Sequence, residues 1–434
     1  MQRRYIRSVE KSTMDEIEKT RGNLEIGVFQ ENDLQRLHHL LQDAFTQTTL
    51  DIGAGILGLF LDREVEQFCG QRYSHSKDHD CHRHGKQAGS IYMGGQKTPI
   101  LKPRVRGRNN REVILPLYKR LQNPELFGDS VLRHMLHGVS CRKYDEVIEH
   151  TVERLGVKKS TVSAAFQALT KKKLAEFERR RLDQDRWIVL FVDGKPIGGE
   201  MVISVLGVNK QGEKGILGFR QGSTENAVVA VDLFQDLKDH GLDVSEGVLF
   251  VIDGSKALRS AIHQVFGDMV YVQRCRVHKK RNVLGYLPKN LREEIAAEID
   301  EAYQETDIKK AREALNKVAT RLERVGPDAA ASMREGLDET LTALQFNVPE
   351  ILMKSIMTTN PMESVNSMVE DQIRRVKRWG GFDMRKRWMA AGYIEAEKHA
   401  NRIKGCKYLD DLENWMKKDL EKRFGKLDES KGVA

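Results

Sequence analysis

The spacing of apolar positions divides the chain into helical ends and a strand-rich middle. From residue 1 to 72 apolar residues recur every three or four positions, as in residues 33–45, which predicts a mainly helical N-terminal region. Gly53 to Gly58 match a G-x-G-x-x-G pattern, but the preceding residues have helical spacing, whereas a dinucleotide-binding fold needs a buried strand there. We therefore do not interpret these glycines as a nucleotide site.

A Gly- and Pro-rich segment, residues 73–142, comes next. Residues 84–113 alternate between apolar and polar positions and carry many basic residues, which predicts a small β hairpin with basic strands. Five potential metal ligands come just before or at its start: His75, His79, Cys81, His82 and His84. Structural zinc sites usually show two separated ligand pairs, so this single cluster favours a polar loop over a metal site, and both remain open.

Residues 143–184 have the pattern of a helix-turn-helix segment. A first helix over 143–155 ends near Gly156, and Ser160 is a candidate N-cap for a second helix over 161–181. In the second helix Val162, Phe166 and Leu169 are expected to pack inward. The residues expected to face DNA are Thr161, Ser163, Gln167, Lys171 and Lys172. The alternative is an ordinary helix pair with a solvated basic face.

The middle of the chain predicts an α/β domain with a mixed sheet. Strands are expected at 187–194, 200–208 and 214–222, then at 247–254 and 269–275, with helices at 224–241 and 256–266. A hairpin followed by strands that alternate with helices is typical of a mixed sheet in an α/β layer. Residues 185–288 are the first part of this core, 289–350 read as an all-helical insertion, and 351–434 as the last part of the core with C-terminal helices.

The net charge indicates the class of binding partner, and the cysteine content indicates the cellular compartment. Lys and Arg number 72 against 63 Asp and Glu, a net charge of +9 that favours polyanionic partners, although solvated charged faces would give the same excess. Five scattered cysteines, Cys141 among them, indicate a reducing interior. No apolar run approaches the roughly 20 residues that a bilayer crossing needs, and the N-terminus lacks the apolar core of a signal peptide. We expect a soluble cytoplasmic protein.

Acidic residues end two of the expected strands. Asp193 and Asp253 each follow a buried apolar run and precede a glycine, and ligands gather at this edge of an open sheet. Asp before Gly is also ordinary turn chemistry. A third acid, Glu363, lies beyond the insertion, where it is either a further ligand or the partner of Asn360 in a capping-box-like helix start. The sequence pattern favours neither of these two roles for Glu363.

Three acids brought together would point to metal-dependent phosphoryl transfer. Carboxylates about 4 Å apart repel by roughly 4 kcal/mol at an effective dielectric constant near 20, so a buried acidic trio favours a bound cation. Oxygen ligands suit Mg²⁺ or Mn²⁺, and two such ions stabilise the attacking and leaving oxygens of a phosphoryl group. Polynucleotide is the substrate that also matches the basic surroundings.

A cysteine and a histidine lie three positions apart in the basic stretch 271–284. Cys275 and His278 could belong to a zinc site, to a Cys/His nucleophile or to a helix on nucleic acid. The basic residues around them, expected near phosphates, are Arg274, Arg276, Lys279, Lys280 and Arg281. A second basic stretch holds Arg374, Arg375, Lys377 and Arg378. Trp379 follows it and is interpreted as a core residue, with stacking on a displaced base as the alternative.

The order of these motifs resembles a known family. From about residue 30 to 404 the chain is similar to the bacterial Mutator-type insertion-sequence transposases, which are DDE recombinases with a ribonuclease-H-like core. The resemblance rests on the ordered segments "VDG", "FRQGSTEN", "LFVIDGSKALRSAI", "VQRCRVHKKRNVL", "TTNPMESVNSMVE" and "RRVKRWGGFDMRKRW". It implies that Asp193, Asp253 and Glu363 are the catalytic, metal-binding acids. It also implies that the helical stretch between the last two is the family's insertion domain.

The resemblance also bears on Cys275 and His278, which match the family's Cys-x-x-His signature near the active site. A zinc site lacks a second ligand pair, and a protein nucleophile is redundant where water and a DNA 3′ hydroxyl attack phosphorus. We therefore expect Cys275 to pack at a strand end and His278 to approach a phosphate or a metal-bound oxygen. A purely structural pair is the alternative.

The sequence thus predicts a DNA transposase. We expect it to bind terminal inverted repeats of double-stranded DNA through its N-terminal region, and to cleave and join DNA strands with two Mg²⁺ or Mn²⁺ ions. It should act as a homodimer or higher oligomer on DNA, associated with the nucleoid when bound. The alternatives are a non-catalytic sequence-specific DNA-binding regulator derived from a transposase, and a ribonuclease or resolvase on the same core.

Overall fold

The computed structural model describes residues 31–73, 79–93, 96–123, 125–136, 159–197, 199–222, 227–374, 376 and 378–425. The chain divides into two compact units, Met1–Lys171 and Lys172–Ala434. Within the described ranges no helix combines the length and the apolar character needed to span a bilayer.

The first unit packs one long helix against a β hairpin. Its elements are α2 (Glu31–Cys69), β1 (Cys81–Met93), β2 (Gln96–Gly107), β3 (Glu112–Val113), α3 (Pro116–Leu121) and α4 (Glu125–Leu136). Leu61 and Val65 of α2 are buried against Ile91 and Val105 of the antiparallel strands β1 and β2. The expected hairpin is confirmed. Helix α2 runs without a break through Gly53 and Gly58, which confirms that these glycines open no nucleotide-binding turn.

The histidine cluster lies partly on the hairpin. Cys81, His82 and His84 belong to strand β1, so the polar loop expected there is wrong for these residues, while His75 lies outside the described residues. Within the described part of the chain no group of three or more His, Cys, Asp or Glu residues could hold a metal ion.

A five-stranded mixed sheet forms the centre of the second unit. Its strands are β4 (Trp187–Ile197), β5 (Glu200–Asn209), β6 (Lys214–Gly222), β7 (Val248–Ile252) and β8 (Val270–Arg274), in the order β6-β5-β4-β7-β8. Strands β4, β5 and β6 pair antiparallel, whereas β7 and β8 run parallel to β4. The continuous apolar runs of β7 and β8 are buried throughout, as expected for strands covered on both faces. The predicted α/β architecture with a mixed sheet is confirmed.

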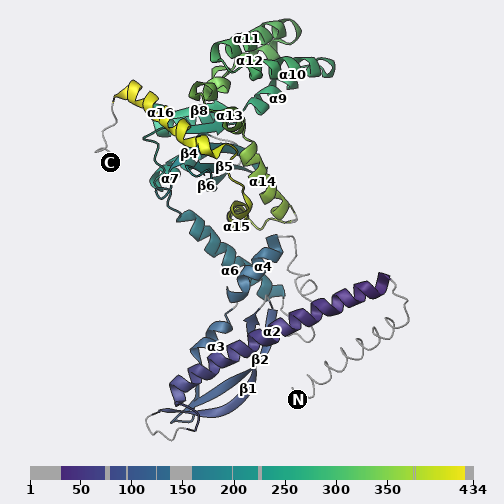
Figure 1. Cartoon of the computed structure of the whole chain (residues 1–434), viewed down its shortest axis with the longest axis vertical. Coiled ribbons are helices and arrows are strands. Elements are labelled where there is room, and N and C mark those ends of the chain that lie inside the picture. The colour runs from purple at the N-terminus through teal and green to yellow at the C-terminus, as the bar shows by residue number, and fades with distance from the viewer. Residues whose placement is uncertain are drawn as a thin grey trace. The chain divides into compact units, whose positions relative to one another are not determined.

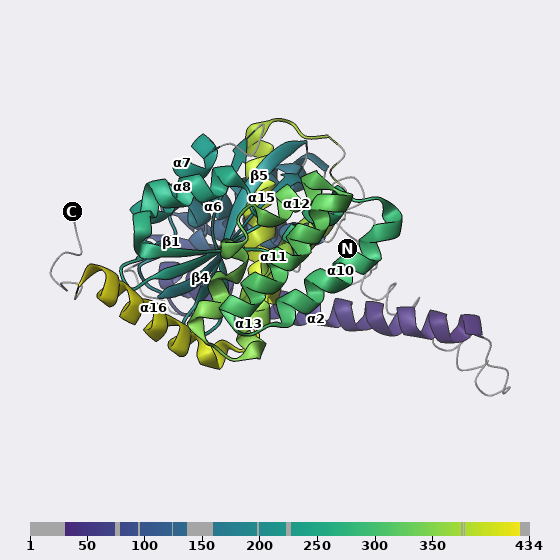
Figure 2. The ribbon, with the colours of Figure 1, turned by 90° about the horizontal axis from the view of Figure 1, so that it is seen from above.

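Helices cover both faces of this sheet (Figures 1 and 2). Helices α7 (Ala227–Asp239) and α8 (Lys256–Phe266) pack on one face, where alternate residues such as Leu190, Val192 and Phe250 point into a shared apolar core. The other face carries α14 (Asn360–Ile373), α15 (Phe382–His399) and α16 (Leu409–Phe424). Because strand side chains alternate, Asp193, next to Val192, points to the face of α14 and α15.

A helical insertion lies between β8 and α14. Helix α9 (Arg276–Gly285) leads into it, and it contains α10 (Lys289–Gln304), α11 (Ile308–Val325), α12 (Pro327–Arg334) and the 3₁₀ segment η2 (Asp338–Phe346). Figure 1 shows α10, α11 and α12 gathered apart from the strands. They share an apolar core that includes Ile299, Leu315, Leu322 and Met333. The predicted all-helical insertion is confirmed, and α13 (Glu350–Ile356) then leads back to the sheet.

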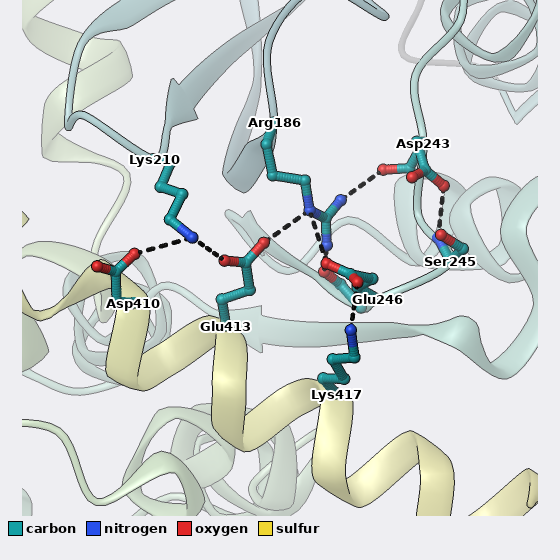
Figure 3. Close-up of polar contacts among 9 residues, drawn as sticks. Arg186, Lys210, Asp243, Ser245, Glu246, Asp410, Glu413 and Lys417 are labelled. Carbon is teal, nitrogen blue, oxygen red and sulfur yellow. Dashed lines mark hydrogen bonds and ion pairs between the residues drawn. The ribbon is translucent and has the colours of Figure 1, made fainter. Parts of the chain in front are cut away.

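Helix α16 is held to the start of β4 by a cluster of charged side chains (Figure 3). The buried carboxylate of Glu413 accepts hydrogen bonds from Arg186 Nε at 2.8 Å and Lys210 Nζ at 3.1 Å. Arg186 also donates to the Asp243 carbonyl at 2.9 Å, and Lys417 pairs with Glu246 at 2.6 Å. Glu413 therefore joins the C-terminal helix to two strand ends at once.

Replacing Glu413 by glutamine keeps the size of the side chain but leaves Arg186 partly buried without its charged acceptor. We expect Glu413→Gln to lower the free energy of unfolding by about 2 kcal/mol, measured by urea denaturation. The control is Glu350→Gln, because the Glu350–Lys354 pair is exposed on both sides and its loss should not be measurable. An equal effect of both variants would contradict the role of the cluster.

Candidate active site

Strand register brings the first two acids together. Val192 of β4 pairs in parallel with Ile252 of β7, so the next residues, Asp193 and Asp253, lie side by side at the carboxyl end of β7, while β4 continues through Asp193 to Ile197. Ile252 in turn pairs with Arg274 of β8, which places Cys275 at the same level. This is the edge at which the sequence predicted a site.

Electrostatic repulsion is concentrated on Asp193, which is only 7% exposed. Burial raises the pKa of Asp193 from its ordinary 3.8 to about 6, and the charges of Asp253 and Glu363 act in the same direction. The His278 side chain and a hydrogen bond from Asn366 lower it only in part. Acids separated by the whole insertion in sequence therefore act on one another in the folded chain.

Asp253 is held by the turn that follows β7. Its Oδ1 accepts the backbone N–H of Ser255 at 2.9 Å, and Ser255 caps α8. Gly254 has φ of +105°, a left-handed conformation that favours glycine. A Cβ at Gly254 would lie 2.2 Å from Nε of Arg274. The tight turn therefore needs glycine both for its dihedral angles and for the close approach of Arg274.

Glu363 lies in the first turn of α14. Its Oε1 accepts the Thr359 hydroxyl at 3.1 Å and lies 3.8 Å from His278 Nε2. The helix begins at Asn360, so Asn360 is not its N-cap, and the preceding residue, Thr359, makes no side-chain cap. The N–H of Thr359 donates to Cys275 Sγ at 3.4 Å instead of to Glu363, so no capping box forms here. The carboxylate of Glu363 therefore lies between the Thr359 hydroxyl at the helix start and the His278 ring.

Cys275 and His278 connect the end of β8 with Glu363, the third acid. Cys275 is fully buried and its N–H donates to the Ile252 carbonyl at 2.7 Å. His278 Nδ1 lies 3.2 Å from Thr359 Oγ1. A hydrogen bond with Cys275 raises the pKa of His278, burial opposes this, and Glu363 and Asp253 add to it. For Cys275 burial raises the pKa of the thiol, but hydrogen bonds with His278 and Thr359 outweigh it and lower the pKa.

Three basic residues of this stretch do not face solvent. Arg274, Arg276 and Lys279 are 5%, 8% and 0% exposed, so the prediction that they contact phosphate is wrong. Arg274 Nη1 donates to the Glu335 carbonyl at 2.9 Å, Arg276 Nε donates to the Thr340 carbonyl at 3.0 Å, and Lys279 Nζ donates to the carbonyls of Ser332 and Glu335. Burial lowers the pKa of Lys279 to about 7. These cations hold the end of α12 and η2 against the core.

The other predicted basic contacts are on the surface or outside the described residues. Lys280 pairs with Asp300 at 2.6 Å, and Arg281 is exposed. Arg374 and Arg378 are exposed, while Arg375 and Lys377 lie outside the described residues. Trp379 is half-buried, so its interpretation as a core residue is not supported.

The geometry agrees with what comparison with known proteins finds. A family model described as "Transposase, Mutator family" matches residues 32–391, which include all three acids. The chain belongs to this family. It is 25% identical over 368 residues to the transposase for insertion sequence element IS256 in transposon Tn4001 of Staphylococcus aureus, a match that covers 82% of this chain and 88% of that protein. It is 27% identical over 392 residues to the transposase for IS1081 of Mycobacterium tuberculosis, covering 85% and 90%.

The donor chemistry of the site suits a divalent cation. Asp193 and Asp253 offer hard oxygen ligands, and burial together with the charges of Asp253 and Glu363 raises the pKa of Asp193. The described residues do not form a ready three-ligand metal cluster. Mg²⁺ often takes one or two carboxylates and completes its shell with water and substrate phosphates, so an open donor set fits such an ion.

The predicted DNA-reading residues lie on helix α6 (Lys159–Glu178). Gln167, Lys171 and Lys172 are exposed, and Thr161 and Ser163 are half-buried. Val162 and Phe166 are buried as expected, while Leu169 is only half-buried. The helix begins at Lys159, so Ser160 lies within its first turn and is not its N-cap. The expected first helix of the pair, 143–155, lies outside the described residues.

Sequence reasoning missed three residues of the site: Thr359, Asn366 and Tyr393. Asn366 Nδ2 donates to Asp193 Oδ2 at 3.0 Å, and the Tyr393 hydroxyl donates to Asn366 Oδ1 at 3.2 Å. Asn366 follows Glu363 by three positions on an expected helix, so the spacing was a signal that the two share one face. Nothing in the sequence pattern marked Tyr393.

The raised pKa of Asp193 predicts that the acid destabilises the metal-free protein. The folded state binds the proton more tightly than the unfolded state, so stability is lost as pH rises from about 4 to about 6. We expect Asp193→Asn to raise the free energy of unfolding by about 2 to 3 kcal/mol at pH 7.5, and by little near pH 4. Urea denaturation in the presence of a chelator measures this. Asp300→Asn, in the insertion, is the control, and a gain for Asp193→Asn that does not depend on pH would contradict the prediction.

The tight turn after Asp253 leads to a second prediction, on the free energy of unfolding. Gly254→Ala combines an unfavourable positive φ with a steric clash against Arg274, so we expect a loss of about 2 kcal/mol or more in unfolding free energy. In the matched control, Gly285→Ala at the end of α9, an added Cβ meets nothing within 4 Å. That variant should be neutral or up to about 1 kcal/mol more stable. Thermal unfolding of both variants tests the difference.

Proposed function

We propose that this chain is a DDE transposase that binds the terminal inverted repeats of an insertion sequence and catalyses metal-dependent DNA strand cleavage and strand transfer. The observation that carries the proposal is that strand pairing sets Asp193 beside Asp253 and that Asp193 also lies within electrostatic range of Glu363, which follows Asp253 by about 110 positions in the sequence. Because burying a charged side chain is unfavourable, burial alone would favour a neutral residue in place of Asp193. An acid kept there against repulsion fits a site that takes up positive charge during its reaction.

The topology supports a ribonuclease-H-like core for the catalytic unit. Three antiparallel strands come first in the chain, and two further strands then add in parallel beside β4, the first of them. Asp193 lies within β4, and Asp253 directly follows β7, the parallel neighbour of β4. The helical insertion separates this pair from the third acid, as in the order of motifs on which the family resemblance rests.

Asp193, Asp253 and Glu363 would hold two Mg²⁺ or Mn²⁺ ions. When bound, such ions act as Lewis acids that favour attack on phosphorus by water or by a DNA 3′ hydroxyl. Within the protein, the Thr359 hydroxyl holds one oxygen of Glu363, and the Ser255 N–H holds one oxygen of Asp253. His278, whose pKa is raised, lies 3.8 Å from Glu363, and its protonated form would be available for a phosphate oxygen.

No protein nucleophile is needed in this scheme. Cys275 is a candidate nucleophile at the site, but it is fully buried and its sulfur accepts a hydrogen bond from the N–H of Thr359. A phosphorus atom cannot reach it without unfolding of the start of α14. The role of Cys275 in the proposal is to anchor Thr359, which then orients Glu363.

DNA contacts are proposed for basic and polar residues that are exposed or half-buried. On α6 these are Thr161, Ser163, Gln167, Lys171 and Lys172, and in the second unit Arg281, Arg374 and Arg378. Double-stranded DNA of the element ends and of the target is the partner. Joining two ends requires at least a dimer on DNA, acting at the nucleoid in the cytoplasm of a prokaryote.

Separate assays of binding and chemistry test the proposal. We expect Asp193→Asn, Asp253→Asn and Glu363→Gln each to reduce strand transfer more than about 100-fold, because each removes a ligand that stabilises the transition state by several kcal/mol. Binding of inverted-repeat DNA, measured by gel shift in Ca²⁺, should be retained. The control Asp300→Asn should keep both activities.

Two results would replace the proposal by an alternative. Specific binding of terminal repeats without any strand transfer by the unchanged protein would indicate a DNA-binding regulator. Cleavage of RNA hybrids or junctions without inverted repeats would indicate a ribonuclease or resolvase on the same core.

A further inference from the structure

A chain of three buried polar groups runs from the first acid into the C-terminal helices. Asp193 is 7% exposed, and Asn366 and Tyr393 are each fully buried. Asn366 Nδ2 donates to Asp193 Oδ2 at 3.0 Å, and the Tyr393 hydroxyl donates to Asn366 Oδ1 at 3.2 Å. Burying a polar side chain is unfavourable unless its hydrogen bonds are made, so the two contacts hold each other in place.

The direction of these hydrogen bonds determines which way the amide faces. With Asp193 ionised, its oxygen can only accept, so the NH₂ group of Asn366 must face it. The Tyr393 hydroxyl donates to the opposite side of the amide and disfavours the flipped orientation, in which the carbonyl would oppose a carboxylate. The hydrogen-bond path from Tyr393 to Asp193 therefore runs through Asn366.

The choice of an amide donor suits a site that binds cations. A lysine or arginine in place of Asn366 would hold the same oxygen, but its charge would neutralise Asp193 and compete with a metal ion. An amide fixes the carboxylate without removing its charge. Within the described residues Oδ2 is the Asp193 oxygen that accepts a protein hydrogen bond, and Oδ1 is left for another partner.

We infer, on the basis of the proposed function, that Asn366 is a positioning residue for Asp193 and that Tyr393 fixes the orientation of its amide. Asn366 holds Oδ2 and leaves Oδ1 to a divalent ion. Because Glu363 and Asn366 lie one turn apart on α14, the same helix carries the third acid and orients the first. A shift of α14 would change both ends of the site together.

Three variants of the full-length chain test the inference: Asn366→Ala, Tyr393→Phe and the double variant. The readouts are the Mn²⁺ concentration at half-maximal strand transfer and the Mn²⁺-dependent increase in melting temperature without DNA. Loss of a partner that orients a metal ligand commonly weakens metal binding about 10- to 100-fold. We expect about a 10-fold or greater increase in the Mn²⁺ requirement for Asn366→Ala, and a few-fold increase for Tyr393→Phe.

The double variant separates positioning from simple stability. If Tyr393 acts through Asn366, the double variant should need no more Mn²⁺ than Asn366→Ala alone, because the two effects are not additive. The control is Tyr271→Phe, which removes a hydroxyl hydrogen bond to Asp419 of 2.7 Å on the same sheet. It should lower the melting temperature without changing the Mn²⁺ requirement.

The outcomes distinguish this inference from the proposed function. If Asn366→Ala and Tyr393→Phe melt at lower temperature but keep the Mn²⁺ requirement within twofold of the unchanged protein, the network is structural and the inference is overturned. Additive effects would overturn the role of Tyr393. If Asn366→Ala does not fold, Tyr393→Phe alone decides by the same twofold limit. Retention of strand transfer by Asp193→Asn would overturn the proposed function itself.

Discussion

Parallel pairing between β4 and β7 sets the position of the groups around the site. The pairing of Val192 with Ile252 places Asp193 and Asp253 at one level, and the next pairing, of Ile252 with Arg274, brings Cys275 beside them. Strand alternation then turns Asp193 toward α14. A slip of one residue in this register would turn the acid into the apolar core under α7 and α8, so the packing of that core also protects the geometry of the site.

The polar groups around the site fall into two sets, those that contact the acids and the basic side chains that contact the insertion. The groups that touch the acids are an amide, a hydroxyl, a backbone N–H and an imidazole, from Asn366, Thr359, Ser255 and His278. The lysine and arginine side chains nearby, such as Arg274 and Lys279, donate instead to main-chain carbonyls of the insertion. The protein thus offsets the mutual repulsion among the acids only in part, through His278 and Asn366, which is unfavourable for stability and suits the uptake of divalent cations.

Much of this arrangement could be predicted from the sequence, and the rest depended on tertiary contacts. The apolar runs of β4 and β7 identified the sheet, and their position before Asp193 and Asp253 identified its functional edge. Glu363 was ambiguous because a helix start and a ligand site use the same residue types, and only the contact between Thr359 and Cys275 separates them. Arg274, Arg276 and Lys279 were predicted to lie at the surface. Their charge alone does not reveal that main-chain carbonyl groups of the insertion accept their hydrogen bonds. Tyr393 reaches Asp193 through a second residue, which no local pattern reveals.

The network between Asp193 and α14 also bears on synthesis of the chain. Asp193 and Asn366 are 173 positions apart, and Tyr393 lies further on. Long-range contacts of this kind form late, because much of the chain must first be ordered. A polypeptide still emerging from the ribosome can complete β4 and β7, but it lacks the helix that carries the third acid until nearly all of its length has been translated. Unfinished chains are therefore unable to bring the three acids of the proposed active site together.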